Sequence, residues 1–270
     1  MALRFFEATE HASVYQKYML RSPKEVHSLI ISYLENKKGR PFNLAVDVGC
    51  GTGESTRALA VHFQKVFGID HSDAQIQEAK SVVSPPNVFY LVATAEKLPF
   101  EDESVDLITA SVAAHFFNQE EFLQEVDRVL KPNGCLAMYS VKPHLDICYK
   151  DCSQHATDAF MEAFDSLVCG PGASIIGIMK TEYEEMFKAM HFTHKTRISN
   201  IVMKRTMPVS AVVGFMESVF LFQYKFSDNP EAGKDFLQKL QERILKAIGE
   251  SSVDTELEVC YSYFCLLACK

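Results

Sequence analysis

The order of hydrophobic and polar positions is regular over the first half of the chain. Short apolar runs that predict buried strands cover residues 44–48, 66–69, 88–92, 105–110 and 135–141. Apolar residues recur at helical spacing between these runs, most clearly over 122–130, and Ser72 or Asp73 can cap a helix that follows the second run. Alternating strands and helices predict a parallel sheet covered on both faces, with right-handed crossovers.

The second half of the chain follows a different pattern. Residues 144–190 are expected to be largely helical, with an interruption at 169–174, and a strand is expected at 194–203. Helices are expected over 23–34, 208–222 and 231–249, and a last strand over 257–268. The segment KPNG at 131–134 should end the helix that precedes it, because it places Pro and Gly just after the last apolar position.

Length and charge narrow the class of protein. A chain of 270 residues suits one α/β domain with additions. The net charge of −8, from 27 basic and 35 acidic residues, argues against nucleic acid as a partner, because no basic excess is present to neutralise phosphates. No apolar stretch reaches the roughly 20 residues of a membrane helix, and the N-terminus lacks the pattern of a signal peptide, so we expect a cytoplasmic protein.

The eight cysteines do not form a recognisable metal motif. No CxxC pair occurs, which argues against a zinc ribbon. Cys148 and Cys152, with His144 and His155 nearby, define one imaginable metal site, but scattered reduced thiols are the simpler interpretation. We therefore expect no metal.

The segment VDVGCGTG at 46–53 predicts a ligand-binding loop. Its glycines, Gly49, Gly51 and Gly53, lie between a predicted strand and a predicted helix, where ligands approach the carboxyl edge of a parallel sheet. No Lys follows, which argues against a P-loop. The spacing is GxGxG rather than the GxGxxG of dinucleotide sites.

Two acidic residues near the glycines narrow the chemical class of the expected ligand. Asp70 closes the second strand, the position from which a carboxylate can accept both ribose hydroxyls. Asp47 precedes the glycines and would repel a pyrophosphate but not a cationic group. Together the acids predict a nucleoside without phosphates that bears an amino group, and S-adenosylmethionine meets that description.

Four segments carry a family resemblance: VDVGCGTGESTRAL, GIDHSDAQIQEAK, ATAEKLPFEDESVDLITA and EVDRVLKPNGCLAMYS. They resemble the successive motifs of class I S-adenosylmethionine-dependent methyltransferases. The AEKLPF loop is similar to the branch with ubiquinone and sterol methyltransferases. The N-terminal YxxYxxRxP pattern and the tail resemble the trans-aconitate methyltransferase-like, methyltransferase type 11 group. The motifs cover roughly residues 10–141. The resemblance implies a Rossmann-like seven-stranded sheet in the order 3-2-1-4-5-7-6, with an antiparallel last strand.

The resemblance also implies roles for individual residues. The cofactor-binding residues would be Asp47, Gly49, Gly51, Thr52, Gly53, Asp70, His71, Ala95, Glu96 and Ser111. Asp47 and the glycines would line the methionine part, Asp70 would hold the ribose, and Ala95 and Glu96 would flank the adenine. The candidate catalytic residue is His115, and the candidate substrate-binding residues are Tyr18, Arg21 and Phe116.

Several of these residues have a second interpretation. His115 can act as a general base, orient the substrate, or pack beneath the sheet edge. Tyr18 and Arg21 fit a lid or an N-terminal helix cap. The Phe and Met residues between 186 and 222 fit an acceptor pocket or ordinary core. Arg21, Lys142 and Arg205 are candidates to bind an acceptor carboxylate.

We therefore expect one methyltransferase domain over 1–270 that acts on a small-molecule acceptor, a carboxylate or another metabolite. Residues 1–40 would form a helical cap, 42–141 the cofactor-binding core, and 142–250 helical insertions that build the acceptor pocket. The protein would be a monomer or weak homodimer, with neither nucleic acid nor membrane as a partner. The rival hypotheses are a protein or RNA methyltransferase, a non-catalytic cofactor-binding homologue, and a dinucleotide enzyme.

Overall fold

The computed structural model describes residues 9–20 and 22–270, without the side chains of 9 and 10. The chain divides into two compact units. We call Arg21–Val141, Ile178–Ile201 and Tyr263–Lys270 the core unit, and Met1–Leu20, Lys142–Gly177 and Val202–Ser262 the helical unit. The predicted cofactor core, residues 42–141, lies wholly in the core unit.

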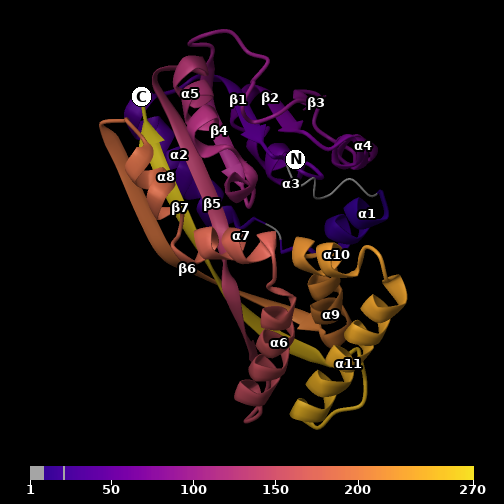
Figure 1. Cartoon of the computed structure of the whole chain (residues 1–270). Coiled ribbons are helices and arrows are strands. Elements are labelled where there is room, and N and C mark those ends of the chain that lie inside the picture. Colours follow the sequence, from indigo (N-terminus) through magenta and orange to yellow (C-terminus); the bar gives the residue numbers. More distant parts are fainter. Residues whose placement is uncertain (1–8, 21) are drawn as a thin grey trace. The chain divides into compact units, whose positions relative to one another are not determined.

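A seven-stranded sheet in the order β3-β2-β1-β4-β5-β7-β6 confirms the expected Rossmann-like methyltransferase topology, with an antiparallel last strand (Figure 1). Its strands are β1 (Phe42–Val48), β2 (Phe63–Asp70), β3 (Val88–Val92), β4 (Val105–Ser111), β5 (Leu130–Cys148), β6 (His194–Pro208) and β7 (Glu256–Cys269). Each of the strands β5, β6 and β7 has one part in the core unit and one part in the helical unit.

The central strand β1 pairs in parallel with β2 and β4. Asp47 lies level with Gly68 on β2 and Thr109 on β4. The last four residues of β1 are all buried, as expected for a parallel strand covered on both faces. The carboxyl ends of β1, β2 and β4 therefore meet at one edge of the sheet.

The core unit contains the helices expected over 23–34, after Ser72 and around 122–130. Its helices are α2 (Lys24–Lys38), α3 (Glu54–Leu59), α4 (Asp73–Ser81), α5 (Gln119–Val129) and α8 (Glu184–Ala189), with the short 3-10 helix η1 (Ala114–Phe116) after β4. Ser72 caps α4 by accepting a hydrogen bond from the Gln75 N–H, which confirms one of the two expected caps. These helices flank the sheet and fix the loops at its carboxyl edge.

The segment KPNG was only partly predicted. The helix does end just before it, at Val129, but 131–134 lies inside β5 and not in a separate turn. The register explains the difference: Val105 pairs with Leu130 and Leu107 with Cys135, so the segment forms a bulge opposite β4. Asn133 takes a positive φ of 63° there.

The helical unit contains α1 (Thr9–Tyr18), α6 (Ser153–Leu167), α9 (Val209–Ser218), α10 (Phe220–Phe226) and α11 (Pro230–Ile248), while α7 (Pro171–Lys180) joins the two units. Two expectations were wrong here. Residues 144–148 continue β5, since buried and exposed residues alternate along them, and the helix expected over 208–222 is two helices that meet at Val219. Among the described helices, none is long and apolar enough to cross a membrane.

Candidate functional site

The glycine turn packs tightly against Ala113 in the loop after β4 and against Tyr90 on β3. Gly49, Gly51 and Gly53 all have positive φ, at 67°, 52° and 77°. A Cβ on Gly49 would lie 2.5 Å from the Cβ of Ala113, and one on Gly53 would lie 2.4 Å from the hydroxyl of Tyr90. At Gly49 and Gly53, both the positive φ and the lack of room for a Cβ therefore require glycine. Close packing fixes the backbone of the turn.

Asp70 stands at the end of β2 and binds the glycine turn. Its Oδ2 accepts a hydrogen bond from the Gly51 N–H at 2.9 Å, and its Oδ1 accepts one from the Ser72 N–H at 2.9 Å. Burial raises the pKa of this carboxyl, and the backbone N–H groups of Ser72, Gly51 and His71 oppose that shift. A carboxylate offers about four acceptor positions, so Asp70 keeps acceptor capacity for a ligand hydroxyl.

His71 follows at the same edge. Its side chain is 42% exposed, and its Nδ1 lies 3.5 Å from the Asp70 Oδ1. His71 and Asp70 are consecutive in the chain, and both side chains lie at the end of β2.

Asp47 has no exposed surface. Its Oδ2 accepts a hydrogen bond from the Thr56 hydroxyl and its Oδ1 from the Thr109 hydroxyl, both at 2.7 Å. Burial raises the pKa of this carboxyl to about 6, although both threonines lower it. The side chain links β1 to α3 and β4, beneath the glycine turn.

The other predicted cofactor residues lie on the loops around this edge. Thr52 is buried, and its carbonyl accepts a hydrogen bond from Arg57. Ala95 is also buried, and the half-buried Glu96 accepts a hydrogen bond from the Asn118 N–H at 2.9 Å. Glu96 therefore connects the loop after β3 to the start of α5.

Ser111, at the end of β4, belongs to a polar cluster that sequence reasoning missed. Its hydroxyl lies 3.0 Å from that of Ser22, which in turn lies 2.9 Å from that of Ser55. The buried Tyr139 donates to Ser55 at 3.1 Å. The cluster connects the segment before α2 to α3, β4 and β5. No short sequence motif predicts it, because its members are far apart in the sequence.

His115 forms a buried pair with Tyr183. Only 5% of His115 is exposed, and its Nδ1 lies 2.6 Å from the Tyr183 hydroxyl. Burial lowers the pKa of His115 to about 3 and raises that of Tyr183 well above its usual value. Both side chains are therefore uncharged at neutral pH.

The backbone that leads to His115 is strained. Val112 has a φ of 52°, in a region that β-branched residues rarely adopt. Its N–H donates to the Tyr139 carbonyl at 2.8 Å, which holds this conformation in place. Strain of this kind is concentrated at functional sites and costs on the order of 1–3 kcal/mol.

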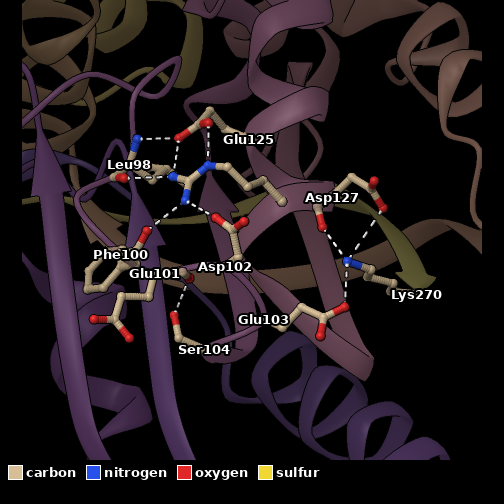
Figure 2. A network of polar contacts seen from close by, with 10 residues as sticks. Leu98, Phe100, Glu101, Asp102, Glu103, Ser104, Glu125, Asp127 and Lys270 are labelled. Atoms are coloured by element: carbon tan, nitrogen blue, oxygen red, sulfur yellow. Dashed lines mark hydrogen bonds and ion pairs between the residues drawn. The ribbon is translucent and has the colours of Figure 1, made fainter.

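Arg128 on α5 organises the loop that follows Ala95 and Glu96. Figure 2 shows the loop residues Leu98, Phe100 and Asp102 together with Glu125. The Arg128 guanidinium donates to the carbonyls of Leu98 and Phe100 and to the carboxylates of Asp102 and Glu125. Glu125 in turn accepts from the Leu98 N–H at 2.7 Å, and Arg128 holds the pKa of that carboxyl below its usual range. The EVDRVLKP segment was the signal for this contact, but its Arg was not recognised as a site residue.

The three predicted substrate residues are not all placed at this edge. Phe116 lies against His115, with ring centroids 4.3 Å apart. Tyr18 belongs to the helical unit, where its ring fills the space above Gly214. Arg21 lies outside the described residues. The other two candidate cations, Lys142 and Arg205, belong to the helical unit.

Comparison with known proteins gives consistent matches. Residues 46–138 match a methyltransferase domain family. A protein of Dictyostelium discoideum named as a methyltransferase is 30% identical over 86% of this chain and 82% of its own length. A methyltransferase-like protein of Schizosaccharomyces pombe is 26% identical over 81% of this chain and 79% of its own.

Solved structures support the same fold. A type II methyltransferase from Anaeromyxobacter dehalogenans has a TM-score of 0.71 at 21% identity and covers 92% of this chain and 97% of its own. Phosphoethanolamine N-methyltransferase 2 of Haemonchus contortus, solved in complex with S-adenosyl-L-methionine, has a TM-score of 0.50 at 16% identity and covers 97% of this chain and 57% of its own. With its motifs, its strand order and these relatives, the chain belongs to the class I S-adenosylmethionine-dependent methyltransferases, in the type 11 group, and S-adenosylmethionine is its cofactor.

Proposed function

We propose that this enzyme transfers the methyl group of S-adenosylmethionine to a small-molecule carboxylate. The proposal has two parts, the binding of the cofactor at the edge formed by β1, β2 and β4, and the choice of acceptor. The observation that carries the second part is the buried, uncharged state of His115.

For the cofactor, Asp70 would bind the ribose, since its carboxylate keeps acceptor capacity beyond what the backbone N–H groups of Gly51, Ser72 and His71 use. The glycine turn would face the methionine part, with Thr52 and Ser111 beside it. Ala95 and Glu96 would flank the adenine, and His71 would lie next to the ribose. Asp47 would act from beneath, by fixing the strand and the turn through Thr56 and Thr109.

S-adenosylmethionine supplies an electrophilic methyl group on a sulfonium centre. The protein has to present a nucleophile in line with that group, and positioning with exclusion of water provides much of the rate enhancement. An amine or alcohol acceptor must also lose a proton, usually to a base whose pKa lies near the working pH. A carboxylate is already ionised at neutral pH and needs no base.

His115 is poorly suited to act as that base. A group with a pKa of about 3 accepts a proton weakly at neutral pH. Tyr183 keeps its hydroxyl proton, and we assign it the donor role toward Nδ1, which places the imidazole proton on Nε2. Nε2 would then be a hydrogen-bond donor, which suits a carboxylate oxygen. We therefore assign His115 an orienting role and Phe116 an apolar wall beside it.

The names of relatives cover more than one acceptor chemistry. A malonyl-acyl carrier protein O-methyltransferase of Coxiella burnetii is 34% identical over 45% of this chain and 41% of its own. The Haemonchus contortus enzyme is named as an N-methyltransferase. We favour an oxygen acceptor because of the state of His115. We further propose a cytoplasmic monomer or weak homodimer, and helical insertions over 142–250 that line the acceptor pocket.

A labelled-methyl assay tests the acceptor. The purified enzyme is incubated with methyl-labelled S-adenosylmethionine and trans-aconitate, related tricarboxylates, their amides, or primary amines of matched size. We expect label only with the carboxylates, in a product that mild base hydrolyses, as a methyl ester does. Label that resists base, or that enters amines in preference to carboxylates, would refute the carboxylate proposal and leave the cofactor assignment standing.

The role of His115 has a separate test in the pH dependence of kcat. An orienting imidazole with a pKa of about 3 gives a profile without an inflection between about pH 6 and 8. His115→Gln should lower kcat and leave that profile flat, since glutamine keeps an N–H donor. A kcat that falls below a pKa near 6.5 in the native enzyme, and no longer does so in the variant, would show that His115 acts as a base.

A further inference from the structure

A cluster of two thiols and a carboxylate lies in the helical unit, apart from the residues assigned to the cofactor. The Sγ atoms of Cys148 on β5 and Cys260 on β7 are 3.8 Å apart. The Oε1 of Glu258 lies 3.8 Å from the Cys260 Sγ, and all three atoms lie within 4.8 Å of one another. Cys148 and Cys260 are 112 positions apart in the sequence, and the neighbouring strands β5 and β7 bring them together.

The strands direct all three side chains to the same, outer face. Along the end of β5, Leu145 and Ile147 are buried, whereas the positions that alternate with them are exposed or half-buried. Along the start of β7, Leu257 and Val259 are buried, and Glu258 and Cys260 face the other way. The cluster is therefore accessible to small ions from solvent while its strands are anchored in the core.

The distances match a tetrahedral thiolate site. Two sulfur ligands at about 2.3 Å from a zinc ion lie about 3.8 Å apart when the angle is tetrahedral, which equals the observed spacing of the two Sγ atoms. A sulfur and a carboxylate oxygen on the same ion lie about 3.5 Å apart, slightly less than the observed 3.8 Å. A short movement of the Glu258 side chain would complete three corners of the tetrahedron and leave the fourth to water.

The surrounding charge is balanced for a divalent ion. Lys204 on β6 donates to the Glu258 Oε1 at 2.9 Å. Two thiolates and one carboxylate exceed the charge of a divalent cation by one negative charge, and the Lys204 ammonium supplies the missing positive charge. A metal ion binds the thiolate form of cysteine, so metal binding would displace protons from the two thiols.

We propose that Cys148, Cys260 and Glu258 bind a thiophilic divalent metal ion of the zinc class, which clamps β5 to β7. Two thiols select this class because soft sulfur ligands favour zinc over calcium or magnesium. The site differs from the one that the sequence made imaginable: Cys152 and His155 are not part of it, and His144 instead pairs with Asp146 at 3.3 Å.

Cobalt titration of the reduced, metal-free, full-length protein tests the proposal. We expect thiolate-to-cobalt charge-transfer absorption and tetrahedral visible bands that saturate at one ion per chain and disappear when Zn²⁺ is added. Release of protons during Zn²⁺ binding, followed with a pH indicator, should accompany the displacement of the thiol protons. A native protein that gives no such absorption overturns the proposal, and so does one that forms a Cys148–Cys260 disulfide but binds no metal.

Variants assign the signal to the cluster. Cys148→Ser and Cys260→Ser should each lower the cobalt affinity by more than about 100-fold, beyond the range seen for residues outside the ligand set. Lys204→Ala should weaken binding by about 10-fold. Cys152→Ser, a half-buried thiol four positions from Cys148, is the matched control and should bind cobalt like the native protein. Persistence of the signal in folded forms of both cluster variants would place the metal elsewhere and overturn the proposal.

Discussion

The buried carboxyl of Asp47 should make the stability of this protein depend on pH in an unusual direction. Folding raises the pKa of Asp47 from 3.8 to about 6, so between these values the folded state binds more protons than the unfolded state. The free energy of unfolding should therefore fall as pH rises through this range. A shift of about 2.2 units at 1.36 kcal/mol each amounts to about 3 kcal/mol. About 2 kcal/mol of this is lost between roughly pH 4.5 and 8.

Asp47→Asn removes this titration and keeps the shape of the side chain. Asparagine offers only one acceptor oxygen to Thr56 and Thr109, so the variant loses one hydrogen bond. This loss lowers the free energy of unfolding by an amount that does not depend on pH. The readout is therefore the difference between variant and native protein as pH changes. We expect this difference to move by about 2 kcal/mol in favour of the variant from about pH 4.5 to pH 8.

Urea unfolding at a series of pH values, followed by circular dichroism, measures this difference. The matched control is Asp73→Asn, which removes an exposed acid in the first turn of α4 and leaves the buried contacts of Asp47 in place. A difference for Asp47→Asn that is independent of pH, or that moves in favour of the native protein as pH rises, would show that Asp47 is not buried as a destabilised carboxylate.

Three further substitutions test the packing around the site. Gly49→Ala should lower stability by at least about 2 kcal/mol and weaken cofactor binding, because a Cβ meets both a positive φ and the Ala113 side chain; an unchanged urea midpoint would refute this. Arg128→Lys should cost about 2 kcal/mol and raise the cofactor Kd, since lysine cannot replace the fork that holds the loop; calorimetry with equal affinity for both proteins would contradict it. Tyr183→Phe should lower kcat with little change in cofactor Kd, because His115 loses its partner at Nδ1; native steady-state kinetics would exclude the orienting role.

The sequence predicted the sheet and its carboxyl edge well because both depend on local patterns. The strands β1 to β4 are short, and the turns after β1 and β2 carry glycines and the capping Ser72. Residues that act close to their place in the sequence, such as Gly51 and Asp70, were found together as expected.

What the sequence missed depends on contacts between distant segments. The partner of His115 is Tyr183, which lies 68 positions away in a left-handed turn before α8. The partner of Cys148 is Cys260 across two strands, so the local spacing to Cys152 was misleading. The long extension of β5 was also missed, because alternating exposure over 144–148 is a weak signal next to the helical pattern that follows.

The most direct test of the central assignment is calorimetry of S-adenosylhomocysteine binding to the native protein and to Asp70→Asn. We predict that the native protein binds S-adenosylhomocysteine and not NAD. Replacing Asp70 should weaken S-adenosylhomocysteine binding by at least about 10-fold, because one acceptor oxygen then has to serve the Gly51 and Ser72 N–H groups and the ligand. Asp73→Asn should bind like the native protein. Equal affinity of Asp70→Asn and native protein for S-adenosylhomocysteine, or binding of NAD in its place, would contradict the cofactor site described for this edge of the sheet.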